Sequence, residues 1–432
     1  MDRFVIEGGT PLRGRVSISG SKNATLPLMA AALLADTPTT LHNVPDLRDT
    51  QTMAEVLRHL GAEVTFQDHT MVIDPRGFTN HEAPYDMVRK MRASVYVMGP
   101  MIARLRRAKV SLPGGCAIGP RPIDLHLKGF SALGAVLDIE HGYVVAEVPD
   151  LKGAEFSLSG AAGSSVGATC NVLMAAVLAK GETVIHGAAR EPEVLELISF
   201  LKKMGAQIEG AGERVLKIRG VSGLSGTEHT IVADRIEAGT FMVAAAITSG
   251  DIIIENAPLD HLDAVISKIH EIGARVEPGD NGTRVYGVLE RYSPTNIQTW
   301  TYPGFPTDMQ AQFMALLSLV SGTSIIRETI YVDRFLHAAE LNRMGANIQV
   351  LNGMATIQGV PKLSGAPVMA SDLRASAALV IAGLAAEGTT IVNRVYHIDR
   401  GYEAIEKKLS ALGARVLRIS DDEPEDPPAT ET

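Results

Sequence analysis

The chain is poor in cysteine, in aromatic residues and in long apolar runs. It has 432 residues, of which two are cysteines, one is tryptophan and 5% are aromatic. Cys116 and Cys170 are too few for a disulfide framework, which favours a reducing compartment such as the cytoplasm. The longest apolar run, LPLMAAALLA, falls far short of the roughly 20 residues that a membrane span needs, and no basic-then-apolar leader is seen. We therefore expect no insertion into a membrane.

Positive charge and known cofactor motifs are also scarce. Lys and Arg number 40 against 49 Asp and Glu, and the net charge of −9 argues against a nucleic acid or an anionic membrane as partner. The sequence has no GxxxxGK[ST], GxGxxG or HExxH motif, and its 12 histidines are scattered. It therefore implies no cofactor and no metal. Residues 421–432 are acidic and rich in proline, and we expect this tail to be disordered.

One short pattern occurs six times along the chain. An apolar stretch ends in Gly-Ala and is followed by β-branched residues, and its glycines are Gly61, Gly134, Gly205, Gly273, Gly345 and Gly413. Successive glycines are 73, 71, 68, 72 and 68 residues apart. A glycine after an amphipathic run is typical of a helix end from which a strand departs. Together with an Ala-rich segment upstream in each copy, the pattern predicts six units of strand, helix, strand, helix, strand and strand.

The Ala-rich segments are expected to be buried helices. They are apolar on nearly every side, and they begin around Lys22, Arg92, Ser165, Arg235, Asp308 and Arg374. The second helix of each unit is amphipathic and should be more exposed. Because three buried helices make one core and six make two, we predict an α/β fold of two three-unit domains, with helices inside and sheets outside.

Cationic residues recur at equivalent positions of the units. The six helix starts lie 37 to 42 residues before the glycine of their unit, and the loops before the second helices carry Arg48, Arg121, Arg190, Arg334 and Arg400. Arg48 and Arg190 fit surface loops equally well, whereas the other three lie in unusual local contexts. Helix N-termini favour anions, and cations beside them strengthen the effect. The pattern predicts a site for a multiply charged anion that carries both phosphate and carboxylate.

Two residues are candidates for proton transfer. Residues 111–126, SLPGGCAIGPRPIDLH, break the repeat pattern and place Cys116 in a loop rich in Gly and Pro, near Arg121. A nearby cation lowers the pKa of a thiol, which makes Cys116 a candidate acid or nucleophile, whereas Cys170 lies in an apolar helix and should be inert. Asp308 is the acidic member of the helix-start set. It is either a helix cap or a general base for a hydroxyl, as a lone carboxylate among cations.

Several segments closely resemble the UDP-N-acetylglucosamine 1-carboxyvinyltransferase family. They are ISGSKNATLP, KMRASVYVMGP, LPGGCAIGPRPIDLH, FPTDMQAQFMALLSL, DLRASAALVIAG and YHIDRGYEAIEKKLSALGA, and the resemblance covers about residues 1–420. It implies an inverted α/β barrel, or prism, of six βαβαββ repeats in two pseudo-threefold domains. It also implies that residues 22–232 form the first domain and that residues 1–21 join residues 233–420 in the second, an exchange that the repeats alone do not reveal.

The resemblance implies a reaction as well. The enolpyruvyl group of phosphoenolpyruvate would pass to the 3-hydroxyl of UDP-N-acetylglucosamine, with release of phosphate, as the first committed step of peptidoglycan synthesis. Cys116 would act as the general acid, and Asp308 would lie near the sugar hydroxyl. Phosphate would be held by Lys22, Arg121 and Arg400, and carboxylate by Arg334 and Arg374. The uridine nucleotide would be bound by Arg121, Pro122, Ile123, Asp124, Leu125, Ser165, Val166 and Gly167. Asn23 and Arg92 would join the active site, and Ile330 is a further implied substrate contact. This chain has Gly163 where the family often carries a lysine, which removes a side chain expected near a nucleotide phosphate.

Two alternatives stay open at this point. One is the enolpyruvyl transferase that acts on shikimate 3-phosphate, which lacks an equivalent cysteine loop. The other is a catalytically silent homologue that only binds a nucleotide, against which the retained set of Cys116, Asp308, Lys22 and Arg400 argues. The sequence does not decide the oligomeric state, and a monomer is compatible with it.

Overall fold

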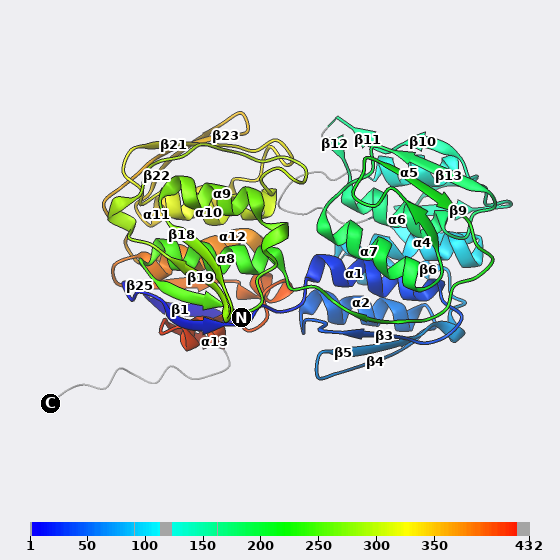
Figure 1. The fold of residues 1–432 in the computed structure, drawn as a ribbon, viewed down its shortest axis with the longest axis horizontal. Helices are drawn as coiled ribbons and strands as arrows, with labels where there is room; N and C mark the ends of the chain where they lie inside the picture. Colours follow the sequence, from blue (N-terminus) through cyan, green and yellow to red (C-terminus); the bar gives the residue numbers. More distant parts are fainter. Residues whose placement is uncertain (1, 90, 113–122, 162, 421–432) are drawn as a thin grey trace.

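The computed structural model describes residues 2–89, 91–112, 123–161 and 163–420, with Arg92 described by its backbone alone. The described chain forms two lobes that lie side by side (Figure 1). One hydrophobic core gathers residues from Ala24 to Ile231, and a second gathers residues from Phe4 to Ile18 and from Ile236 to Val416. We call the two lobes the first half and the second half. The separate cores support the predicted division after residues 21 and 232, which stays a prediction.

Three four-stranded sheets belong to the first half, and they share one pattern of pairing. In each, the first strand runs parallel to the second, and the other neighbours are antiparallel. In spatial order they are β16 (Glu228–Thr230), β3 (Thr39–His42), β5 (Thr70–Asp74) and β4 (Glu63–Gln67); β6 (Glu82–Ala83), β7 (Arg107–Ser111), β9 (Tyr143–Glu147) and β8 (Val136–Glu140); and β10 (Glu155–Ser157), β13 (Glu182–His186), β15 (Val215–Arg219) and β14 (Gln207–Glu209). A short hairpin pairs β11 (Ser159–Gly160) with β12 (Gly163–Ser164).

Three further four-stranded sheets in the second half repeat the same pattern. In spatial order they are β2 (Arg13–Val16), β17 (Asp251–Ile254), β19 (Gly282–Tyr286) and β18 (Arg275–Gly279); β20 (Ile297–Gln298), β21 (Thr323–Arg327), β23 (Met354–Gln358) and β22 (Asn347–Leu351); and β24 (Pro367–Met369), β25 (Thr389–Asn393), β1 (Arg3–Glu7) and β26 (Arg415–Ile419). The N-terminal strands β1 and β2 thus complete sheets of the second half, while β16 completes a sheet of the first half.

The first helix of each predicted unit is buried, as its composition indicated. The regular ones are α1 (Lys22–Ala31), α6 (Val166–Ala176), α8 (Arg235–Ile247), α10 (Gln310–Leu317) and α12 (Leu373–Ala385). In α8 every residue is buried, and in α12 only the first and last are not. A side chain on any face of such a helix is removed from water, so these helices form the centre of each core.

The helix expected from Arg92 is not a regular α-helix. A 3₁₀ segment, η3 (Arg92–Val97), continues into a short α turn, α4 (Met98–Pro100), and a π-helical segment, η4 (Met101–Leu105). Gly99 packs against the backbone of Asn171, where a Cβ at Gly99 would lie 2.4 Å from the Asn171 carbonyl oxygen. This close approach to α6 explains part of the departure, because it fixes the chain from outside the segment.

The second helices are the amphipathic ones, and they end where the repeated glycines predict. They are α2 (Arg48–His59), α5 (Asp124–Ala132), α7 (Pro192–Lys203), α9 (Asp263–Ile272), α11 (Leu336–Arg343) and α13 (Ile405–Ala411). The remaining short helical turns are α3 (Tyr85–Val88), η1 (Ala32–Leu34), η2 (Pro75–Gly77), η5 (Leu259–His261), η6 (Leu289–Arg291), η7 (Thr307–Met309) and η8 (Val395–Arg400). All six glycines of the repeat have a positive φ, between 92° and 118°. Glycine adopts this left-handed conformation at no steric cost, so it ends the helix and releases the next strand.

Two segments run side by side where the chain passes between the halves. Gly20 and Ala233 form an isolated antiparallel bridge. The Ser21 N–H donates to the carbonyl of Val232 at 2.8 Å, and the Asp234 N–H donates to the carbonyl of Ser19 at 2.8 Å. This paired crossing leads directly into α1 on one side and into α8 on the other, so the starts of both helices lie at the junction.

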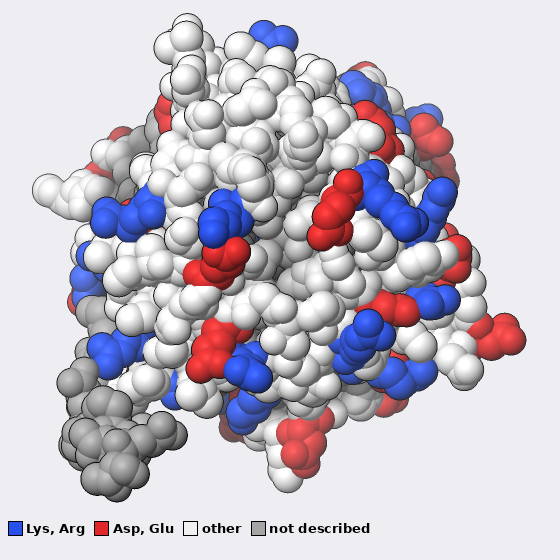
Figure 2. Space-filling model, turned by 90° about the vertical axis from the view of Figure 1, so that its left-hand side faces the viewer, with Lys and Arg blue, Asp and Glu red and all other residues white. Residues whose placement is uncertain are grey.

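The outer face of the second half carries charges of both signs. Figure 2 views this end of the molecule, where Lys and Arg alternate with Asp and Glu over a mostly uncharged surface. No helix within the described residues is long and apolar enough to cross a membrane.

Candidate active site

Asp308 lies between two arginines that come from different elements of the second half. Its Oδ1 accepts a hydrogen bond from Arg334 Nη1 at 2.8 Å, and its Oδ2 accepts one from Arg374 Nη2 at 3.0 Å. Asp308 belongs to the 3₁₀ turn η7, and Arg374 is the second residue of α12. Neither η7 nor α10 has a side-chain cap, so Asp308 is not an N-cap, although it is an acidic residue in the first turn of η7.

The exposure of these three side chains shows how they are layered. The side chains of Arg374 and Arg334 are 2% and 6% exposed, whereas that of Asp308 is 27% exposed. The carboxylate therefore lies on the open side of both guanidinium groups. Burial acts to raise the pKa of Asp308, but Arg374 and Arg334, with Lys22 further away, outweigh it and hold this pKa well below its usual value.

Arg374 has hydrogen-bonding capacity that the described residues leave unused. Its Nε and Nη1 are buried and have no hydrogen-bond partner among them. The ring of Tyr402 lies 5.4 Å from the guanidinium carbon, and the Tyr402 hydroxyl is 2.9 Å from Thr240 Oγ1. Buried donors without a partner are costly, so an arginine that pairs with Asp308 and still has two unused donors is suited to receive an anionic ligand.

A second cluster joins the two halves around Asp49. Lys22 Nζ lies 3.3 Å from Asp49 Oδ2, and Arg400 Nε donates to Asp49 Oδ1 at 2.9 Å. Lys22 begins α1 and Asp49 is the second residue of α2, both in the first half, whereas Arg400 ends η8 in the second half. Asp308 is thus not the lone carboxylate that the sequence suggested. Sequence reasoning missed Asp49, although its position next to Arg48, one of the repeated arginines, was a signal.

The two clusters are electrostatic neighbours. Burial lowers the pKa of Lys22, and Arg374 and Arg400 lower it further, while Asp49 and Asp308 act in the opposite direction. Charges from both halves therefore affect the pKa of Lys22. The predicted set of Lys22, Asp308, Arg334, Arg374 and Arg400 forms one charged region at the junction of the halves.

The residues implied for the nucleotide lie together at another part of the first half. Ile123 is the N-cap of α5, which begins at Asp124 and continues with Leu125, and Ser165 is the N-cap of α6, followed by Val166 and Gly167. A Cβ at Gly167 would lie 3.2 Å from His126 Nε2, and one at Gly160 would lie 3.3 Å from a methyl group of Leu125. The starts of the two helices are therefore adjacent. Gly163 faces Thr301 of the second half, whose methyl group would be 3.4 Å from a Cβ there.

Other predicted residues are placed as follows. Asn23 is the second residue of α1, and Ile330 lies in the loop before Arg334, with its N–H donating to Glu328 Oε1 at 2.8 Å. Cys116, Arg121 and Pro122 lie outside the described residues, as does the side chain of Arg92. Cys170 is fully buried, and burial raises the pKa of its thiol, which agrees with the expectation that it is inert.

The remaining cations of the repeated set have structural partners or lie at the surface. Arg235, at the start of α8, pairs with Glu193 of α7 through Nε and Nη2 at 3.0 and 3.3 Å. Both side chains are at least nine-tenths buried, and the pair joins the two halves. Arg190 Nη2 donates to the carbonyl of Tyr302 at 3.4 Å, and Arg48 is exposed at the start of α2.

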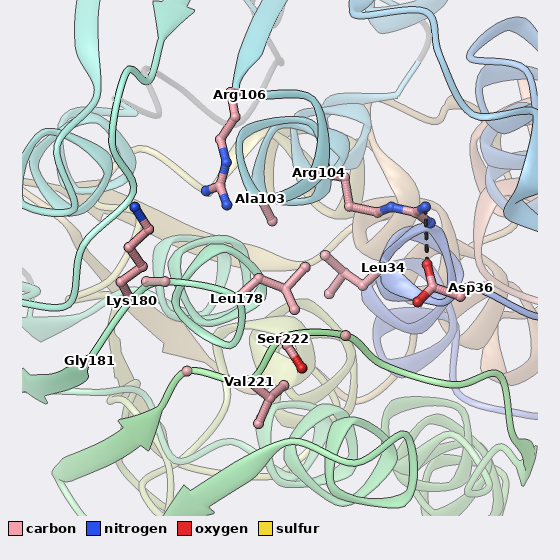
Figure 3. Close-up of a pocket in the computed structure, with 13 residues that line it drawn as sticks. Leu34, Asp36, Ala103, Arg104, Arg106, Leu178, Lys180, Gly181, Val221 and Ser222 are labelled. Carbon is pink, nitrogen blue, oxygen red and sulfur yellow. Dashed lines mark ion pairs between the residues drawn. The ribbon is translucent and has the colours of Figure 1, made fainter.

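A cavity of about 610 Å³ lies away from this charged region. Figure 3 shows Arg104, Arg106 and Lys180 around it, where the buried helices of the first half end. Arg104 donates to the carbonyl oxygens of Leu33 and Ala35 and pairs with Asp36, and Lys180 pairs with Asp150. Asp36 and Asp150 thus neutralise Arg104 and Lys180, whereas Arg106 forms no ion pair with another described residue. Within the described part of the chain, no group of His, Cys, Asp and Glu could hold a metal ion.

Comparisons with known proteins give a consistent result. The family model described as EPSP synthase (3-phosphoshikimate 1-carboxyvinyltransferase) matches residues 6–409. The UDP-N-acetylglucosamine 1-carboxyvinyltransferase 2 of Carboxydothermus hydrogenoformans is 54% identical over 98% of this chain and 100% of its own length. The UDP-N-acetylglucosamine 1-carboxyvinyltransferase of Desulfatibacillum aliphaticivorans is 53% identical over 97% of this chain and 100% of its own.

Solved structures show similar folds. The enolpyruvyl transferase NikO from Streptomyces tendae superposes with a TM-score of 0.87 at 25% identity, over 96% of this chain and 98% of that one. EPSP synthase from Acinetobacter baumannii superposes with a TM-score of 0.73 at 18% identity, over 97% of this chain and 100% of that one. At that identity the second likeness concerns the fold alone.

Proposed function

The chain belongs to the EPSP synthase family and, within it, to the UDP-N-acetylglucosamine 1-carboxyvinyltransferases, and from this membership we propose how its site works. It transfers the enolpyruvyl group of phosphoenolpyruvate to UDP-N-acetylglucosamine in the synthesis of cell-wall peptidoglycan. The acceptor in our proposal is the 3-hydroxyl of the sugar, and inorganic phosphate is released. The observation that carries the proposal is that Asp308 forms ion pairs with Arg334 and Arg374, next to the cluster of Lys22 and Arg400.

Each end of phosphoenolpyruvate has a cationic partner in this arrangement. Arg334 and Arg374 would hold the carboxylate, because guanidinium groups match carboxylates in a bidentate geometry and Arg374 has unused donors. Lys22 and Arg400, with Arg121 from outside the described residues, would hold the phosphate. Since these cations come from both halves, one substrate molecule would join them.

The reaction would proceed by addition and elimination. Asp308 takes the proton of the sugar hydroxyl as its oxygen bonds to C2 of phosphoenolpyruvate, and Cys116 gives a proton to C3. In the second step the Cys116 thiolate takes a proton from C3, the double bond returns and the bond from C2 to the phosphate oxygen breaks, while the proton on Asp308 passes to the leaving phosphate. Asp308 can act as this base only after the substrate carboxylate has bound Arg334 and Arg374 in its place. Until then, its ion pairs with these arginines hold its pKa well below the usual range.

The sugar nucleotide would lie along the adjacent helix starts of the first half. Ile123, Asp124 and Leu125, with Arg121 and Pro122, would line the uridine on one side, and Ser165, Val166 and Gly167 on the other. Asn23, Arg92 and Ile330 complete the proposed contacts. The first N–H groups of α6 suit an anionic group, because they have no partner within the helix, apart from that of Ala168, which donates to the Ser165 hydroxyl.

The fold also has a finer description in this proposal. Six βαβαββ units would form two pseudo-threefold domains, residues 22–232 on one side and residues 1–21 with 233–420 on the other, as an inverted α/β barrel. The shared pairing pattern of the six sheets supports this description. We place the enzyme in the cytoplasm, where both substrates of such a reaction would be expected.

The test is an assay of phosphate release by the purified full-length protein. Phosphoenolpyruvate is supplied with UDP-N-acetylglucosamine in one sample and with shikimate 3-phosphate in another, and the product mass is measured. We expect release only with the sugar nucleotide, together with a product heavier by one carboxyvinyl group. Phosphate release only with shikimate 3-phosphate would favour the transferase that acts on shikimate 3-phosphate. No release with either acceptor would favour a catalytically silent homologue that only binds a nucleotide.

A further inference from the structure

Asp49 is the buried centre of a three-residue contact that spans both halves. Its Oδ1 accepts from Arg400 Nε at 2.9 Å, while its Oδ2 lies 3.3 Å from Lys22 Nζ and 3.5 Å from Arg400 Nη2. One carboxylate therefore fixes two cations that the fold brings from α1 and η8. The three charges sum to one net positive charge.

The layering of this contact is the reverse of that at Asp308. The Asp49 side chain is 4% exposed, whereas those of Lys22 and Arg400 are 12% and 29% exposed. The carboxylate thus lies behind its cations, while Asp308 lies in front of its arginines. An anion arriving from the solvent side would meet Lys22 and Arg400 first and would leave Asp49 in place.

We infer that Asp49 is a positioning residue for the reaction, which holds Lys22 and Arg400 at the spacing that binds one phosphate group across the two halves. This inference rests on the proposed function, because it takes these two cations as the phosphate ligands. Asp49 touches neither substrate nor reacting atoms in this account. Its contribution is to limit the motion of a lysine and an arginine whose long side chains would otherwise lose more conformational freedom on binding.

Charge gives the inference a second consequence. Burial disfavours the protonated form of Lys22, and so do the positive charges of Arg374 and Arg400. The negative charges of Asp49 and Asp308 favour it. Removing the negative charge of Asp49 would lower the pKa of Lys22 further. Lys22 would then lose its proton, and its hold on phosphate, at a lower pH than in the unaltered protein.

The test compares Asp49→Asn with Asp46→Asn. Asp46 is an exposed aspartate in the same loop, and its carboxylate accepts a hydrogen bond from Gln51 rather than from a cation of the site. For Asp49→Asn we expect the KM for phosphoenolpyruvate to rise roughly tenfold or more, as for the loss of one charge-assisted hydrogen-bond network. The basic limb of the pH profile of kcat/KM should move to lower pH, and the Kd for UDP-N-acetylglucosamine should stay unchanged. Asp46→Asn should match the unaltered protein in all three.

A purely structural Asp49 would give a different result. In that case Asp49→Asn would have a lower unfolding temperature than the unaltered protein. Its KM for phosphoenolpyruvate and the basic limb of its pH profile would not change, and this outcome would overturn the inference. If Asp49→Asn does not fold, Asp49→Glu keeps the charge but moves the carboxylate, so the KM should rise while the limb stays. An unchanged KM in Asp49→Glu would then contradict the inference. Failure of the proposed function is distinguished by the unaltered protein itself, which would release no phosphate.

Discussion

Asp308 and Asp49 each contact two cations, yet they differ in which partner faces the solvent. Asp308 covers Arg334 and Arg374 from the open side, and Asp49 supports Lys22 and Arg400 from behind. A ligand carboxylate that reaches the two arginines from the open side would therefore displace Asp308 from them. Its carboxylate would be released next to the bound substrate, where a base is needed.

This exchange predicts different acid limbs for two kinetic parameters. In the free protein the pKa of Asp308 lies well below its usual value, so Asp308 stays ionised where a free aspartate would take up a proton and adds no acid limb to kcat/KM there. With substrate bound, the loss of its arginines and the new negative charges raise its pKa. The acid limb of kcat should therefore lie at higher pH than that of kcat/KM in steady-state assays.

Asp308→Asn serves as the control for this prediction, because an amide cannot take the proton. We expect it to fold and to bind UDP-N-acetylglucosamine, and to lower kcat by roughly 10²- to 10⁴-fold, as for the loss of a general base. Coincident acid limbs in the unaltered protein, or near-normal turnover in Asp308→Asn, would contradict the proposed role.

The two cysteines should differ in reactivity. Cys170 is fully buried in α6, and burial raises the pKa of its thiol, so an alkylating reagent should not reach or activate it in the folded protein. We expect brief treatment with iodoacetamide to label Cys116 and to abolish activity, and phosphoenolpyruvate with the sugar nucleotide to protect against both. Peptide mass spectrometry locates the label. Modification of Cys170 alone would contradict this assignment.

At the scale of elements, the six glycines were the part of the fold most readable from the sequence. Each ends an amphipathic helix with a positive φ, as a local rule of backbone conformation predicts. Their surroundings nevertheless differ. A Cβ at Gly61 would lie 2.1 Å from the carbonyl oxygen of Gly77, whereas one at Gly413 would meet nothing within 4 Å.

This difference predicts unequal costs for the same substitution. Gly413→Ala pays only for the left-handed backbone, about 1 kcal/mol of unfolding free energy. Gly61→Ala adds a clash with backbone that cannot move without disturbing η2, so its cost should be at least twice as large. Urea denaturation of the two variants measures both. Equal losses of unfolding free energy in the two variants would show that the left-handed backbone alone sets the cost. The close contact at Gly61 would then be relieved without cost.

Other elements depended on contacts that no local pattern encodes. The segment after Arg92 mixes 3₁₀, α and π turns, in part because Gly99 packs closely against α6, and Pro100 beside it has no N–H to donate. The pairing of β1 and β2 with the second half joins residues separated by more than 200 positions. The partnership of Asp49 with Arg400 is similarly remote, which is why the sequence pointed to the cations and not to the carboxylate between them.

At the scale of the whole molecule, buried ion pairs join the halves. Glu193 and Arg235 form such a pair across the junction, and both side chains are nearly inaccessible to water. A buried arginine that loses its carboxylate keeps the cost of desolvation without the attraction that offset it. The pair therefore links the stability of one half to that of the other.

Glu193→Gln should weaken this link. We expect a loss of about 3–5 kcal/mol in unfolding free energy, as for other broken buried ion pairs, and a broader thermal transition in calorimetry as the halves unfold less cooperatively. Asp251→Asn is the matched control, because it breaks the exposed pair with Arg284 and should cost less than about 1 kcal/mol. A narrow transition at an unchanged temperature in Glu193→Gln would argue that the halves are coupled elsewhere.

The central claim is that one phosphoenolpyruvate molecule is held by both halves. A crystal structure with phosphoenolpyruvate, or a stable analogue, and UDP-N-acetylglucosamine tests it most directly. The account predicts the phosphate on Lys22 and Arg400 with Asp49 still behind them, the carboxylate on Arg334 and Arg374, and Asp308 turned from its arginines toward the sugar hydroxyl. A ligand bound to one half alone, with Asp308 still seated on both arginines, would contradict it.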